Sequence, residues 1–127
     1  MIRVLVGILG MTLLASSASS EHLLTYRISG ACLDSIEVQE SADLRSWGIF
    51  FSISASHSEI FTETTRKHIG SKIRITNGVG QDIGAPLATI QTPLPPQVLL
   101  AGYPSEGQAQ SALESIVNGG GSCGPST

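Results

Sequence analysis

Short runs of alternating apolar and polar residues recur along the chain and predict β-strands. In most runs one face is apolar and the other polar, as in a sheet with one face in the core and the other in water. Residues 47–53 are apolar on both faces, which favours a central strand. The predicted strands cover residues 24–28, 36–39, 47–53, 72–76, 87–90 and 98–101. The first two form either a hairpin or two separate strands.

Apolar residues three and four apart predict a first helix between residues 57 and 69. Ser56 and Glu59 have the spacing of a capping box, in which each side chain satisfies a free backbone N–H of the first turn. Gly70 supplies the left-handed residue that often follows a helix. A capped amphipathic helix that starts near His57 is therefore expected.

A second helix is predicted from the stripe of apolar residues between Ala109 and Val117. Ser105 and Gln108 again have capping-box spacing, and the glycines at 119–121 end the helix. Each helix has one apolar stripe, so we expect an α+β fold: a mostly antiparallel or mixed sheet with both helices packed on one face. Residues 22–119 would form this single small domain, followed by a flexible Gly/Ser-rich tail at 120–127.

Residues 1–18 have the composition of a secretory signal peptide, in which Arg3 precedes an apolar run and small residues lead to Ala18. The run is shorter than the roughly 20 residues that a transmembrane helix needs, and no later segment approaches that length. The mature chain is therefore expected to have no transmembrane span and to be periplasmic or secreted.

Charge narrows the classes of partner. Removing Arg3 from the seven Lys and Arg leaves six against ten Asp and Glu, a net charge of −4. This balance argues against nucleic acid and against an anionic membrane as the main partner. Basic residues do gather near the end of the first helix and in the next strand. They form either a solvated face or a docking patch for an acidic partner: Arg66, Lys67, Lys72 and Arg74.

Two cysteines, Cys32 and Cys123, stand near the two ends of the mature chain. In an oxidising compartment they could pair. The disulfide would close a loop of about 90 residues and stabilise the fold by on the order of 4 kcal/mol. Cys123 lies in a glycine-rich segment that can reach a partner or remain free, so the sequence leaves the pairing open.

The sequence offers no catalytic residue, metal ligand or cofactor-binding motif. His57 and His68 lie on one predicted helix about 16 Å apart, so they cannot share an ion, and His22 stands alone. The turn-rich segment at 77–84 joins two strands and precedes no helix, so it is a hairpin connection and not a phosphate loop. We therefore expect a protein that is not an enzyme.

A succession of motifs between residues 50 and 119 resembles a known family. FTETTRKHIG places Phe61, Thr65, His68, Ile69 and Gly70 in one helix; a strand, a glycine-containing turn, GAPLATI with Pro86, and a final helix follow. This order resembles the head subdomain in the first periplasmic domain of SecD, a subunit of the bacterial protein-export translocase. The resemblance implies a SecD-head-like fold. The resemblance implies this fold more strongly than it implies a role in translocation. This chain has no transmembrane helices after its leader, has His68 where the family has Asn, and lacks the family's Asp-Gly-Lys turn.

These observations predict a non-enzymatic exported binding module that contacts unfolded polypeptide or an envelope or secretion complex. The candidate binding element is the strand after Pro86, with Leu87, Thr89 and Ile90, because an exposed sheet edge can pair with an extended segment. The alternative is a small-ligand-binding or inhibitor-like domain, with a pocket between the helices and the loops TPLPP and AGYPS. A purely structural domain is a third reading.

Overall fold

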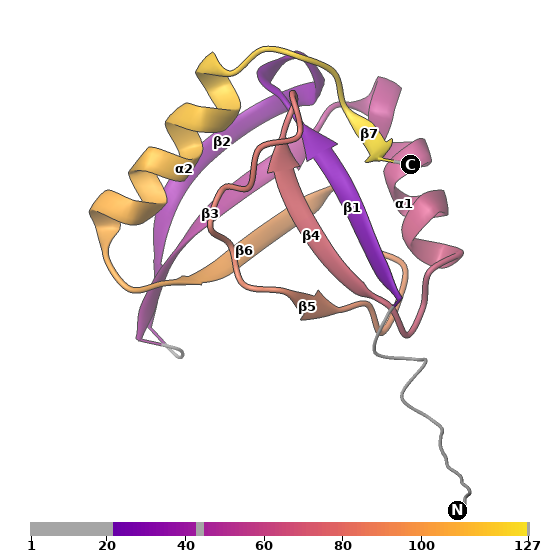
Figure 1. The fold of residues 1–127 in the computed structure, drawn as a ribbon, viewed down its shortest axis with the longest axis horizontal. Coiled ribbons are helices and arrows are strands. Elements are labelled where there is room, and N and C mark those ends of the chain that lie inside the picture. The colour runs from indigo at the N-terminus through magenta and orange to yellow at the C-terminus, as the bar shows by residue number, and fades with distance from the viewer. Residues whose placement is uncertain (1–21, 43–44, 127) are drawn as a thin grey trace, which may run out of the picture.

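The computed structural model describes residues 22–42 and 45–126; the expected signal peptide lies outside these ranges. The described residues form seven strands and two α-helices, which confirms the α+β class (Figure 1). The elements are β1 (Leu23–Ile28), the short 3-10 turn η2 (Gly30–Cys32), β2 (Leu33–Ser41), β3 (Ser46–Ile53), α1 (Ala55–Arg66), β4 (Lys72–Asn77), β5 (Ala88–Thr89), β6 (Gln97–Tyr103), α2 (Glu106–Asn118) and β7 (Gly124–Ser126). Within the described ranges, no helix is long and apolar enough to cross a bilayer.

The strands divide between two sheets. The mixed sheet has the order β5-β4-β1-β7, in which β1 and β4 are parallel and the other pairs antiparallel. The antiparallel sheet has the order β2-β3-β6, so β3 is central as its apolar faces predict. The first two predicted strands are thus separate. The turn at Gly30–Cys32 directs the chain from one sheet to the other, which the strand pattern alone did not reveal.

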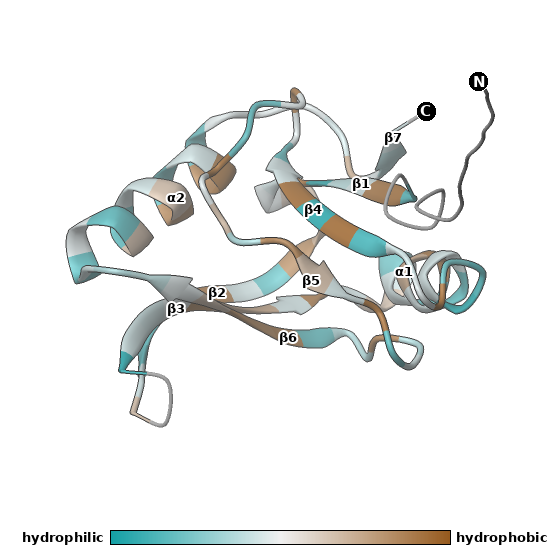
Figure 2. Cartoon of the chain, turned by 60° about the horizontal axis from the view of Figure 1, so that its bottom comes forward, coloured by the Kyte–Doolittle hydropathy of each residue, from teal (hydrophilic) through white to brown (hydrophobic). Residues whose placement is uncertain are grey.

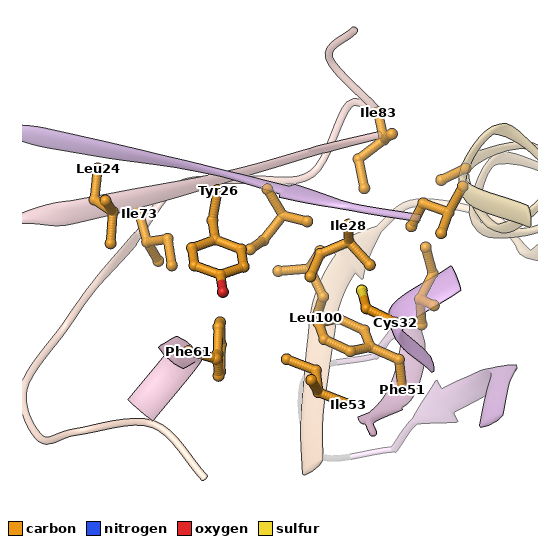
Figure 3. Close-up of a cluster of buried hydrophobic side chains, with 14 of the residues drawn as sticks. Leu24, Tyr26, Ile28, Cys32, Phe51, Ile53, Phe61, Ile73, Ile83 and Leu100 are labelled. Carbon is orange, nitrogen blue, oxygen red and sulfur yellow. The ribbon is translucent and has the colours of Figure 1, made fainter. Parts of the chain in front are cut away.

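The core fills the space between the two sheets (Figure 2). Its main residues are Leu24, Tyr26, Ile28, Ile49, Phe51, Ile53, Ile73, Ile75 and Leu100 from the strands, and Phe61, Ala109, Ala112 and Ile116 from the helices. The rings of Tyr26 and Phe61 meet edge to face, with centroids 5.0 Å apart (Figure 3). The helices flank this space on opposite sides and do not share one face of a single sheet, because each closes a different open side (Figures 1 and 2).

The start of α1 differs from the predicted capping box. Its N-cap is Ser54, whose side chain makes no capping hydrogen bond, while the Ser56 hydroxyl lies 3.0 Å from Nδ1 of His57. The end is also displaced: the C-cap is Lys67, and Gly70 takes its positive φ of 93° three residues later. A further turn therefore separates the helix from β4.

The stripe of α1 is narrower than its sequence suggests. Phe61 and Thr65 are fully buried, whereas Ile60 and Ile69 are about half exposed. In α2 the prediction holds better, because the Ser105 hydroxyl accepts a hydrogen bond from the Gln108 N–H at 3.2 Å. The Gln108 side chain returns to the Ser105 hydroxyl and not to its backbone N–H.

The predicted flexible tail is wrong for residues 124–126, which form β7 and pair antiparallel with Thr25–Arg27 of β1. Cys32 and Cys123 are joined by a disulfide, with Cα atoms 6.4 Å apart. This link explains the order of a segment whose composition favours disorder, since it removes chain entropy that Gly and Ser would otherwise keep. The backbone at Gly120 also passes so close to Gly78 that a Cβ at Gly78 would overlap it.

Candidate functional site

The predicted binding strand is an edge strand of the mixed sheet. In β5, Thr89 lies opposite Lys72 and Ala88 opposite Ile73, and the sheet ends at β5. Thr89 is exposed, and Leu87 is 43% exposed. Ile90 is only 1% exposed, so its side chain belongs to the core and cannot contact a partner. The candidate edge is therefore Leu87–Thr89.

Backbone hydrogen bonds show in which direction the N–H and C=O groups of this edge point. The Ile90 N–H donates to the Ser71 carbonyl, and the Ile90 carbonyl accepts from the Gly70 N–H, both at 2.8 Å. Successive residues of an antiparallel strand direct their N–H and C=O groups to opposite sides. Because Ile90 faces the segment that leads into β4, Thr89 directs its backbone groups outward. Thr89 thus presents a donor and an acceptor that an added strand can use.

The segment that carries this edge is held at its start by Pro86. A Cβ at Gly102, which has a φ of 121°, would overlap the Pro86 ring, so this proline lies directly against β6. The residue at position 102 must therefore be glycine for two reasons, the backbone angle and the space. This contact with β6 holds Pro86 two residues before β5 and so fixes where the edge begins.

The other end of the segment is held by two threonines of α1. Thr62 Oγ1 donates to the Leu94 carbonyl at 2.8 Å, and the Leu94 N–H donates to Thr65 Oγ1 at 2.9 Å. The Thr65 hydroxyl itself donates to the Thr62 carbonyl. Thr65, like Phe61, therefore has a structural role: it satisfies the backbone of a partly buried connection that would otherwise carry unpaired groups.

A hollow of about 390 Å³ adjoins the end of the edge, where Gly70 and Ser71 bond to Ile90. Its lining is His22, Lys67, His68, Ile69, Gly70 and Ser71. His68 donates from Nδ1 to the Thr64 carbonyl at 2.7 Å, because a carbonyl oxygen can only accept. The fold thus brings together His22 and His68, which the sequence kept apart.

The parallel pairing of β1 with β4 brings His22 close to His68. No local pattern in the sequence predicts this pairing. His57 lies elsewhere, with its Nδ1 beside the Ser54 and Ser56 hydroxyls. Among residues 22–42 and 45–126, no three His, Cys, Asp or Glu side chains are grouped to hold a metal ion.

The two sheets differ in charge. The strands of the mixed sheet contain Arg27, Lys72 and Arg74 and no acidic residue. These cations point away from the core, because their strand neighbours Tyr26, Ile73 and Ile75 point into it. In the part of the chain that the structure describes, the one ion pair joins Arg66 to Glu63 in α1. The cations of the mixed sheet thus have no carboxylate partner among these residues.

A second hollow, of about 530 Å³, lies between the start of α2 and the loop at 82–84. Tyr103 lies at its base and donates to the Ile83 carbonyl at 2.9 Å. Burial, with a contribution from the Asp82 carboxylate, raises the pKa of Tyr103 to about 12. The AGYPS loop lines this hollow as expected, but TPLPP does not, because Leu94 is bound to α1.

In comparisons with known proteins, no protein-family model, curated protein or solved structure matches the chain. The resemblance to the SecD head therefore stays a prediction from the residues.

Proposed function

We propose that the chain is a non-enzymatic exported module that binds an extended polypeptide segment along the β5 edge. The outward backbone groups of Thr89, at the end of a four-stranded sheet, carry this proposal. An added strand gains affinity from main-chain hydrogen bonds and specificity from the side chains on each face. Unfolded polypeptide, or an extended part of an envelope or secretion complex, has the required form.

Three observations support the exported, SecD-head-like character of the module. The composition of residues 1–18 is that of a signal peptide, and a disulfide between Cys32 and Cys123 suits an oxidising compartment. The motif positions Phe61, Thr65, Gly70 and Pro86 act in packing and in holding the edge segment, as expected of a family pattern that specifies a fold.

The test measures binding of a neutral extended peptide to the purified mature protein. A fluorescein-labelled octapeptide of alternating Thr and Gln is titrated with protein, and anisotropy reports the affinity. Thr89→Pro removes the outward N–H and should weaken binding by about tenfold or more, while Thr89→Ala keeps the N–H and should stay within about twofold.

A control on the peptide guards against a folding defect in Thr89→Pro. The same octapeptide with every backbone amide N-methylated has the same side chains but offers no N–H on either edge, so it cannot form the ladder and should lose binding to the unaltered protein. Equal affinity of the methylated and unmethylated peptides would contradict pairing at this edge.

A second candidate function rests on the hollow between α2 and the loop at 82–84, whose volume is within the range of small-ligand pockets. Native mass spectrometry of the purified protein would show a retained small molecule. Ser111→Trp should displace it by filling the hollow, whereas Gln110→Trp, outside the lining, should not. Absence of any ligand mass would remove this candidate.

A further inference from the structure

We infer that the segment paired with β5 is acidic, with carboxylates on the face that it shares with Lys72 and Arg74. This inference rests on the proposed function and names the chemistry of its partner. It comes from the charge of the mixed sheet, whose strands hold three basic and no acidic residues. The chain as a whole is acidic, so this face is opposite in sign to the rest of the molecule.

Strand geometry places an incoming carboxylate within reach of these cations. Thr89 lies opposite Lys72, so the two side chains stand on the same face of the sheet. A strand added beyond β5 is two strand spacings, roughly 10 Å, from β4. The long side chains of Lys72 and Arg74 can reach across this gap to a Glu of the added strand, because on their face β5 contributes only the short Thr89. Ala88 lies opposite the buried Ile73 and is on the core-facing side.

The side chains that line the hollow beside the edge also favour an acidic segment. Lys67 lines it together with His22 and His68, and the Gly70 and Ser71 backbone joins it to Ile90. A segment that continues past Thr89 therefore meets further basic side chains and no carboxylate in the lining. Side chains of the acidic segment would alternate, with every second residue facing Lys72 and Arg74 and the residues between facing the other side.

The experiment compares three labelled octapeptides in which Thr alternates with Glu, Gln or Lys. For the unaltered protein we expect the Glu peptide to bind about tenfold more tightly than the Gln peptide, and the Lys peptide more weakly than both, as two partly exposed ion pairs would give. Raising the ionic strength from about 0.01 M to about 0.1 M shortens the Debye length from roughly 30 to 10 Å and should remove most of this preference.

Two double variants show which cations cause the preference for the Glu peptide. The double variant Lys72→Gln/Arg74→Gln should bind the Glu and Gln peptides almost equally. The matched control, Arg45→Gln/Arg66→Gln, removes two cations outside the mixed sheet and should keep the preference. An equal loss in both variants would overturn the inference, because the preference would then come from net charge alone.

The outcomes separate this inference from the proposed function. If the Gln and Glu peptides bind equally and Thr89→Pro abolishes both, the edge pairs with extended segments but does not select acidic ones. If none of the three peptides binds, both proposals fail. If sedimentation shows salt-sensitive self-association of the purified protein, the occupant is an acidic segment of a second copy, and the proposal of another polypeptide as the partner is wrong.

Discussion

The two sheets are built differently. The antiparallel sheet joins strands by a hairpin, β2–β3, and carries three carboxylates, Asp34, Glu37 and Glu40, with no Lys or Arg. The mixed sheet gathers strands from both ends of the chain and carries only basic charge. Its outermost strands are short: β5 has two residues and β7 has three.

If β5 is the binding edge, as we propose, strand length alone does not identify such an edge. Strand β2 has nine residues and is a far longer edge than β5. Charged residues along an edge discourage pairing with other chains, and β2 carries three of them. The edge at β5 instead has the small residues Ala88 and Thr89, with basic side chains on the neighbouring strand, so under the proposed function we expect it to favour an acidic strand.

The largest effect should come from cutting the link that holds β7 on the mixed sheet. Cys32→Ala/Cys123→Ala opens a loop of about 90 residues and should lower the free energy of unfolding by about 4–5 kcal/mol in the chain-entropy model. Guanidinium unfolding of this variant and of the reduced protein measures the loss. In this variant, amide hydrogen exchange should become faster in β1 and β7 than in β3. Equal acceleration in both sheets would contradict the claim that the disulfide stabilises mainly the mixed sheet.

A smaller effect concerns Tyr103, which joins β6 of the antiparallel sheet to the loop that leads towards β5. Burial raises the pKa of Tyr103 to about 12 in the folded protein, against an ordinary tyrosine value of about 10, so between these pH values the folded state keeps a proton that the unfolded chain has lost. Its stabilisation is complete below pH 10 and disappears as the pH rises towards 12, by up to about 2–3 kcal/mol.

Unfolding at about pH 9.5 and 11.5 measures this slope, and Tyr103→Phe provides the control. The variant should lose less stability over this interval. Some slope remains, because burial also raises the pKa of Tyr26. Identical slopes for the two proteins would contradict the role given to Tyr103.

Ser105→Ala should have a smaller effect on stability than the loss of the disulfide or the ionisation of Tyr103. It removes the cap of α2, which packs against β2 and β3, and should cost about 1 kcal/mol. Exchange should increase first in the opening turn of α2, while β1 and β4 keep their protection. The matched change Ser56→Ala should cost less, since Ser56 does not cap α1.

Local patterns in the sequence predicted much of this fold. Alternation located the central strand at 47–53, capping chemistry located Ser105, and Pro86 marked the entrance to an edge. The start of α1 was wrong because Ser54 and Ser56 both offer a hydroxyl, and spacing does not show which one ends the strand.

Features that depend on distant pairings could not be predicted. The parallel pairing of β1 with β4 brings His22 to His68, and the order of β7 depends on a disulfide across 91 residues. The burial of Ile90 follows from the register with β4, which places Ala88 opposite the buried Ile73 and so turns Ile90, two residues on, towards the core. The edge segment was thus predicted together with its exposed residues Leu87 and Thr89, but the burial of Ile90 was not predicted.

The most direct test of the account is a map of amide chemical shifts on addition of the Thr-Glu octapeptide. The account predicts that the largest changes fall on Ala88, Thr89, Lys72 and Arg74, with β2 unaffected, and that the Thr89 amide becomes protected from exchange. Changes confined to β2, or to the hollow between α2 and the loop at 82–84, would contradict it.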